Sequence, residues 1–195
     1  LLAYDKQLKI TQETLETRIK NVETIKDLKE GAIVTITDIN EERLYEVGAK
    51  YHAKIFTGED LYSADVDIYA PCAMGATIND ATVHKIKAKV IAEGANGPTT
   101  PEGEEILLKK GVSIIPDILC NSGGVIGSYY EWLQNRNGEI WQMDDVIGKL
   151  ERKLMNSFGK VVVAADEFKV DLRTAAYIVA IRRIELTYRE RGVFP

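Results

Sequence analysis

Residues 89–115 read KVIAEGANGPTTPEGEEILLKKGVSII, and this stretch decides the fold. Two short apolar runs, at 89–92 and 112–115, have the composition of buried β-strands. Between them, Pro101 begins a helix predicted to run to about residue 110, because proline is favoured at the first helical position. A strand, a helix and a second strand joined by short connections indicate a parallel βαβ unit.

The same alternation continues outward along the chain. Further strands are predicted at 32–37 and 67–70, with helices at 11–29, 41–51 and 79–86. Beyond residue 121 the pattern becomes helical: a helix to about 134, a loop at 135–138, and long helices at 143–168 and 171–191. Asp171 is predicted to cap the last helix, whose packing face is predicted from the spacing of Leu172, Ala175, Ala176 and Val179. The pattern predicts an α/β fold, with a doubly wound parallel sheet followed by C-terminal helices.

The composition is that of a globular protein with one well-packed domain, or a large domain with a small appendage. The chain has 195 residues, of which 45% are hydrophobic and 28% charged, and its net charge is −5. Acids and bases are interleaved without a basic stripe, so no nucleic-acid partner is expected. No run approaches the roughly 18 apolar residues of a membrane span, and Leu1–Asp5 lack a signal-peptide pattern. We therefore expect a cytoplasmic protein without a membrane partner.

Cysteine and histidine are too few and too scattered to indicate a metal site. Cys72, Cys120, His52 and His84 show no metal-ligand spacing, so no metal is expected. Both cysteines are predicted to be thiols in a reducing compartment. Cys72 also lacks a nearby histidine or acid that would activate it as a nucleophile.

Asp38 is the first candidate binding residue, because it ends the strand predicted at 32–37. An acid at this position of a βαβ unit can accept hydrogen bonds from the hydroxyls of an adenosine ribose. It would also repel the additional phosphate of NADP, which favours NAD. The alternative is that Asp38 caps the helix at Glu41 or stabilises a turn.

A second candidate segment, APCAMGA at 70–76, follows the strand at 67–70. Open α/β sheets bind ligands at the carboxyl ends of their strands, and Ala-Pro ends this strand. The alternative is a tight strand-to-helix turn that Asn79 caps.

The segment AEGANGPTTPE at 92–102 directly follows a strand. Its small residues allow the backbone to approach a ligand, and Asn96 offers both a donor and an acceptor. Taken alone, an ordinary glycine-rich loop is an equal alternative. The segment is, however, very similar to the EGANGPTTPE motif of glutamate dehydrogenases, in the glutamate/leucine/phenylalanine/valine dehydrogenase family. The resemblance implies that Asn96 lies against the nicotinamide ribose.

Three further motifs carry the same resemblance. PDILCNSGGV at 116–125 resembles the family's PDxLxNAGGV, which implies that Asn121 meets the nicotinamide carboxamide. SYYEW at 128–132 resembles SYFEW, whose serine contacts the substrate side chain, and this implies a substrate-binding role for Ser128. RTAAY at 173–177 is similar to a C-terminal helix of the family that we interpret as structural.

Residues 31–80 most resemble the leucine and phenylalanine members of the family. In these relatives the APCA backbone lies along the dinucleotide, which implies cofactor contacts for Pro71, Cys72 and Ala73. The context TDINEE at 37–42 is similar to the corresponding strand end and supports the ribose role of Asp38. NAD is therefore expected in preference to NADP.

The resemblance spans about residues 31–195 and implies the C-terminal, Rossmann-like nucleotide-binding domain of the family. We expect a helical segment at 1–30, a dinucleotide-binding domain at 31–134, and a helical part of the same domain at 135–195. The glycine-rich turn that seats a pyrophosphate on a helix N-terminus is not found in the sequence. The family's substrate half, with its catalytic lysines, is also not found, so we expect no catalytic residue in this chain.

The resemblance implies a homo-oligomeric, NAD-dependent enzyme that oxidatively deaminates an L-amino acid to a 2-oxo acid and ammonia. Glutamate is the preferred substrate because the longer motifs support it, and a leucine- or phenylalanine-type enzyme stays open. The missing glycine-rich turn leaves another alternative, a truncated and non-catalytic nucleotide-binding or assembly module.

Overall fold

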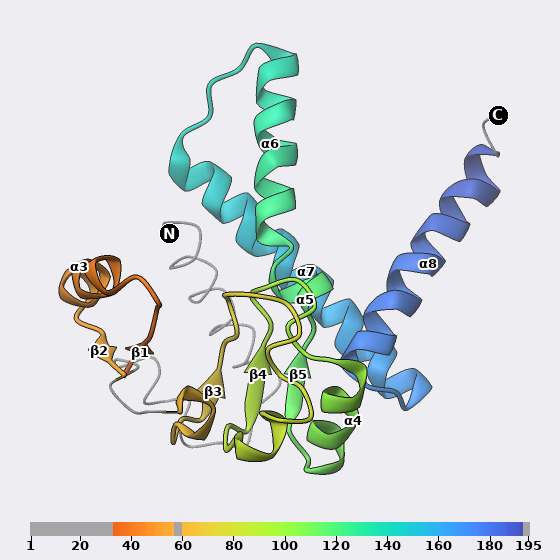
Figure 1. Ribbon diagram of the computed structural model, residues 1–195. Coiled ribbons are helices and arrows are strands. Elements are labelled where there is room, and N and C mark those ends of the chain that lie inside the picture. Colours follow the sequence, from red (N-terminus) through yellow and green to blue (C-terminus); the bar gives the residue numbers. More distant parts are fainter. Residues whose placement is uncertain (1–32, 57–59, 193–195) are drawn as a thin grey trace.

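The computed structural model describes residues 33–56 and 60–192, which form two parallel sheets (Figure 1). The smaller sheet pairs two strands and carries one helix. The larger sheet has the strand order β3-β4-β5. The strands are β1 (Thr35–Ile36), β2 (Lys54–Ile55), β3 (Ile68–Tyr69), β4 (Val90–Ala92) and β5 (Ser113–Ile115).

Helices make up most of the described chain and dominate its C-terminal part. The α-helices are α3 (Glu41–Tyr51), α4 (Pro101–Lys109), α5 (Asp117–Cys120), α6 (Gly123–Asn137), α7 (Met143–Phe168) and α8 (Leu172–Arg191). Two 3-10 helices, η1 (Leu61–Ser63) and η2 (Val83–Lys85), lie in the connections on either side of β3. Parallel sheets followed by C-terminal helices confirm the predicted fold class.

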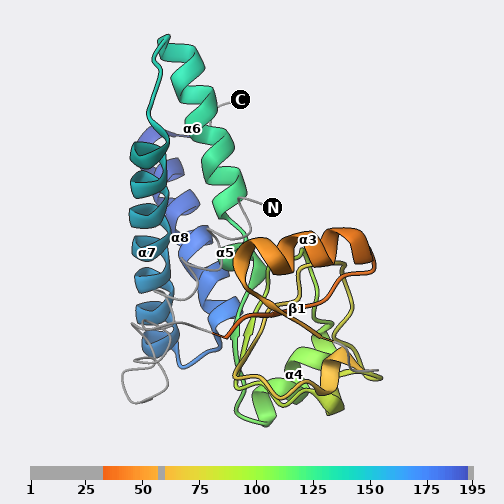
Figure 2. The ribbon, with the colours of Figure 1, turned by 90° about the vertical axis from the view of Figure 1, so that its left-hand side faces the viewer.

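Both faces of the larger sheet are covered, because successive side chains of a strand point to opposite faces. On β4, Val90 and Ala92 join a core cluster with residues of α5, α7 and α8. Ile91, between them, joins a second cluster with Leu107 of α4 and Val83 of η2. Figure 2 shows α7 and α8 on one side of the strands and α4 on the other. This arrangement explains why the predicted strands at 89–92 and 112–115 are almost wholly apolar.

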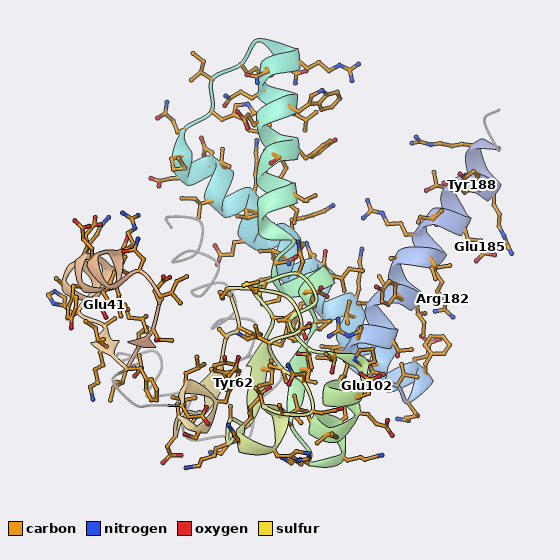
Figure 3. All side chains as sticks on the ribbon, viewed as in Figure 1. Glu41, Tyr62, Glu102, Arg182, Glu185 and Tyr188 are labelled. Carbon is orange, nitrogen blue, oxygen red and sulfur yellow. The ribbon has the colours of Figure 1, made fainter. Side chains whose placement is uncertain are left out.

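The helices α7 and α8 pack against each other and form much of the first core cluster. Leu172, Ala175 and Ala176 are buried, and Val179 packs against them, which confirms the predicted packing face. The Asp171 side chain accepts a hydrogen bond from the Thr174 amide and caps α8, as predicted. Beyond this packed half, Arg182, Glu185 and Tyr188 lie on the exposed C-terminal half of α8 (Figure 3).

Several predicted elements agree closely with the structure, and two do not. The helices predicted at 41–51 and 143–168 are confirmed. The helix predicted at 79–86 is wrong, because only η2 forms there. The Asn79 side chain bonds to the Ala81 amide and the Ala76 carbonyl, and such local bonds compete with a helix.

The loop predicted at 135–138 is also wrong for most of its length. Helix α6 continues to Asn137 and ends at Gly138, which has a φ of 66°. A left-handed glycine is a common helix terminator, so the helix runs to the glycine rather than to the first asparagine. Strand β2 and helix α5 were not predicted, and the helix predicted at 11–29 lies outside the described residues.

Within the part of the chain that the structure describes, no helix is both long enough and apolar enough to cross a membrane.

We expect Leu107→Ala to lower the free energy of unfolding by about 2–5 kcal/mol, because it leaves a cavity in the core between the sheet and α4. Leu107 is 0% exposed. The matched control is Leu108→Ala on the same helix, where the leucine is 39% exposed, and its loss should stay below about 1 kcal/mol. Urea unfolding measures both. Equal losses would contradict the assigned face of α4.

Candidate functional site

The candidate site lies at the carboxyl ends of β3 and β4, where two loops run side by side. The amides of Gly94 and Ala95 both donate to the carbonyl of Pro71, at 3.1 and 2.9 Å. Farther along, the Ala76 amide donates to the Gly97 carbonyl at 2.8 Å. These bonds join the segments 71–78 and 93–100 side by side, and we call the two segments the loop pair. Open parallel sheets bind ligands at this edge.

The loop pair is packed closely enough to require glycine at Gly94. A β-carbon built there would clash with Cys72 Sγ. Cys72 is half-buried against this glycine, while Pro71 is buried and Ala73 exposed. The sulfur of Cys72 therefore faces the neighbouring loop at Gly94. The proposed backbone contact of Pro71, Cys72 and Ala73 with a dinucleotide stays a prediction.

Asn96 and Asn121 meet at this edge although they are distant in sequence. The Asn121 Nδ2 donates to Asn96 Oδ1 and, at 3.4 Å, to the carbonyl of Ala95. Asn96 is exposed on the loop pair, and Asn121 ends α5 directly before α6. The two asparagines predicted to bind the nicotinamide half of a cofactor are thus brought together by the fold.

The bond between the two asparagines leaves hydrogen-bonding capacity on both side chains. It uses one N–H of Asn121 and one lone pair of Asn96. Asn121 therefore still offers its oxygen as an acceptor, and Asn96 its nitrogen as a donor. A primary carboxamide and a ribose hydroxyl each contain both a donor and an acceptor, so they can pair with these two groups.

Beneath the loop pair, Arg173 of α8 contacts three carboxylates, and we call these four residues the Arg173 cluster. Its Nη2 lies 2.7 Å from Glu93, its Nη1 2.9 Å from Asp117, and its Nε 2.8 Å from Glu104. Glu93 is 0% exposed, and its Oε1 has no hydrogen-bond partner among the described residues.

The electrostatics of the Arg173 cluster differ from one acid to another. Burial raises the pKa of Glu104, and the bonds from Arg173 only partly offset this effect. Burial acts in the same direction on Asp117, but hydrogen bonds from the amides of Gly97 and Ile118 and the charge of Arg173 hold its pKa below the ordinary value. The pKa of Arg173 is raised, because the bonds to Glu104 and Glu93 outweigh the effect of burial.

Arg173 is predicted to be structural from its place in RTAAY at 173–177, and no sequence motif singles out its carboxylate partners. One signal was available, since Glu93 directly follows the apolar run at 89–92. A carboxylate at the end of a buried strand requires a cationic partner. The sequence does not show which arginine or lysine supplies it, because Arg173 is 80 residues away.

Asp38 and Ser128 lie apart from the loop pair. Asp38 follows β1 of the smaller sheet, and its Oδ1 accepts a hydrogen bond from the Asn40 amide at 2.9 Å. This bond stabilises the turn, whereas Asn40 itself caps α3. Ser128 is exposed on α6 and donates to the Gly124 carbonyl at 3.1 Å. The ribose role of Asp38 and the substrate role of Ser128 stay predictions.

In residues 33–56 and 60–192, no group of three or more His, Cys, Asp or Glu side chains is arranged to hold a metal ion. The three carboxylates of the Arg173 cluster form ion pairs with its guanidinium.

We expect Asp117→Asn to lower the free energy of unfolding at pH 7, and this loss to shrink as the pH falls. The folded-state pKa of Asp117 is depressed, so its ionised form contributes stability above the unfolded pKa, about 4, and loses it as the pH falls through the lower folded value. Because the side chain is partly exposed, the loss at pH 7 should be about 1 kcal/mol.

Urea unfolding between about pH 3 and pH 7 measures this difference. Asp80→Asn is the matched control, because Asp80 is exposed and undergoes the same chemical change. A difference between Asp117→Asn and the unsubstituted chain that did not vary with pH would contradict the assigned ion pair.

Comparison with known proteins identifies the relatives of this chain. It is 45% identical over 139 residues to a glutamate dehydrogenase of Thermotoga maritima, covering 71% of this chain and 33% of that protein. It is 42% identical over 140 residues to the NAD-specific glutamate dehydrogenase of Peptoniphilus asaccharolyticus, covering 72% and 33%. The chain thus spans about a third of the length of these curated relatives.

Solved structures give the same result for the fold. The glutamate dehydrogenase of Peptoniphilus asaccharolyticus superimposes with a TM-score of 0.63 at 36% identity, covering 82% of this chain and 37% of that one. An L-tryptophan dehydrogenase from Nostoc punctiforme has a TM-score of 0.73 at 23% identity, covering 96% and 60%, and this likeness shows the fold alone. The model of the Glutamate/Leucine/Phenylalanine/Valine dehydrogenase family matches residues 9–192, and the chain belongs to that family.

Proposed function

We propose that this chain is the dinucleotide-binding part of an NAD-dependent dehydrogenase that oxidatively deaminates an L-amino acid, preferably glutamate, to a 2-oxo acid and ammonia. The observation that carries the proposal is the Asn96–Asn121 pair at the carboxyl edge of a parallel sheet. The names of the relatives in Peptoniphilus asaccharolyticus and Staphylococcus aureus, both NAD-specific glutamate dehydrogenases, support it.

The described residues fit the nicotinamide half of such a cofactor better than its adenosine half. Asn121 would meet the carboxamide and Asn96 the adjacent ribose, with the backbone of Pro71–Ala73 along the dinucleotide. A bound NAD would supply the acceptor for a hydride from the Cα of the amino acid, and the protein would supply position and electrostatics. Asp38 would accept hydrogen bonds from the adenosine ribose and disfavour the phosphate of NADP.

The substrate and the assembly are proposed on the same basis. Ser128, exposed on α6, would contact the substrate side chain. We place glutamate ahead of leucine or phenylalanine because the named relatives act on glutamate. We propose a homo-oligomer in the cytoplasm, where both cysteines would stay thiols.

A second function, a non-catalytic nucleotide-binding or assembly module, is favoured by one feature of the sequence. No glycine-rich turn is present to hold a pyrophosphate on a helix N-terminus. Binding and turnover therefore need separate tests.

Cofactor binding is tested by titrating the chain with NADH and following its fluorescence. We expect saturable binding, which Asn121→Ala weakens by about tenfold through loss of hydrogen bonds worth about 1–2 kcal/mol. Asn137→Ala is the matched control, because Asn137 is exposed at the far end of α6. No fluorescence change at millimolar NADH would contradict a cofactor site in this chain.

Turnover is tested on the product of the complete gene, with glutamate, leucine and phenylalanine each supplied together with NAD or NADP. We expect reduction of NAD to NADH to be fastest with glutamate, and reduction of NADP to NADPH to be slower, because Asp38 repels the additional phosphate of NADP. A preference for leucine or phenylalanine would contradict the proposed substrate, and no turnover with any of the three would favour the non-catalytic module.

A further inference from the structure

Each of the three guanidinium nitrogens of Arg173 contacts a carboxylate on a different element. Glu93 follows β4, Glu104 lies in α4, and Asp117 begins α5. Arg173 itself lies in the first turn of α8. A planar guanidinium can fix three partners in direction, whereas a lysine ammonium is a compact point charge.

Asp117 connects this guanidinium to the candidate site. Its Oδ1 faces Arg173, while its Oδ2 accepts a hydrogen bond from the Gly97 amide at 2.8 Å. Gly97 follows Asn96 and has a φ of +53°, a conformation that glycine adopts without strain. The course of the loop at Asn96 is therefore held by a carboxylate that Arg173 orients.

The same aspartate also holds the other side of the asparagine pair. Asp117 begins α5, and its carbonyl accepts a hydrogen bond from the Asn121 amide at 3.0 Å. The Asp117 amide in turn donates to Glu93 Oε2 at 2.8 Å, the oxygen that Arg173 Nη2 contacts. One residue thus fixes the backbone on both sides of the Asn96–Asn121 contact.

We infer that Arg173 is a positioning residue, which acts through Asp117 and Glu93 to hold Asn96 and Asn121 in the arrangement that receives the cofactor. The cofactor role of Asn96 and Asn121 in this inference rests on the proposed function, whereas the hydrogen bonds and ion pairs do not. Glu93 is wholly buried, and a buried carboxylate deprived of its cation is costly. Movement of α8 away from the loop pair would therefore leave the charge of Glu93 buried without its cation, or expose it to solvent.

Amide hydrogen exchange of the full 195-residue chain, followed by NMR, tests this inference without any ligand. Arg173→Lys keeps a positive charge but should accelerate exchange at Gly97 by about tenfold relative to Ile91 in β4, which reports on the core. Asp117→Asn should give the same local effect, because an amide has one oxygen to share between Gly97 and the guanidinium. The Asp117→Asn variant also keeps the test decisive if the Arg173→Lys variant fails to fold.

Two controls separate positioning from general stability. Glu104→Gln weakens the contact of Arg173 with α4, so it should accelerate exchange at Ile91 and Gly97 alike. Arg189→Lys makes the matched change at an exposed ion pair with Glu185 and should alter neither. If Arg173→Lys or Asp117→Asn accelerated exchange at Gly97 no more than at Ile91, Arg173 would contribute only to general stability and the inference would be overturned. Selective acceleration at Gly97 by Glu104→Gln would overturn the assigned route through Asp117 and Glu93.

The cofactor arm of the experiment uses NADH fluorescence with the same proteins. Arg173→Lys should raise the dissociation constant for NADH by about tenfold, a cost of about 1.4 kcal/mol, while Arg189→Lys leaves it unchanged. If the unsubstituted chain bound no NADH, the proposed function would fail, and the exchange data would still decide the role of Arg173. Selective opening at Gly97 without any change in NADH affinity would overturn the link to the cofactor.

Discussion

The contact between Arg173 and the buried Glu93 is the constraint on which the candidate site depends. It joins the first turn of α8 to the end of β4 across 80 residues of sequence. A charge removed from water must be compensated where it lies, so the geometry of this pair permits little variation. Arg173 also forms ion pairs with Asp117 of α5 and Glu104 of α4. The loops above the sheet are therefore ordered by electrostatics as well as by packing.

The sheet makes this arrangement possible by supplying strand ends that converge. Parallel strands place their carboxyl ends on one edge, so Pro71, Glu93 and Pro116 emerge next to one another. Alternation along β4 divides the core into two clusters, and the helices α5, α7 and α8 pack on one face of the sheet. Because α8 begins at this edge, its first turn is the part of the helix that can reach the loops. Packing brings Arg173 close, and hydrogen bonds then fix its direction.

Much of the fold could be predicted from the sequence because its signals are local. The packing face of α8 and its cap at Asp171 need only neighbouring residues to be recognised. The helix predicted at 79–86 does not form, because side-chain hydrogen bonds of Asn79 and Thr82 replace the helical ones. Hydrophobic periodicity does not reveal that competition. Strand β2 has only two residues, and it was not predicted because it is defined by its pairing with β1, which is a tertiary contact. The partner of Glu93 was beyond prediction for the same reason, since nothing local to Arg173 indicates which acid it meets.

The two halves of the proposed cofactor site are not equally organised. Asn96 and Asn121 contact each other and are fixed through Asp117, whereas Asp38 belongs to a turn after β1 in a separate sheet. A preorganised group loses little conformational freedom when a ligand binds, so the contacts that fix Asn96 and Asn121 reduce the cost of binding. The nicotinamide side should therefore supply most of the binding free energy of this chain. Asp38 would act on selectivity between NAD and NADP, because repulsion of a phosphate needs only proximity and no exact geometry.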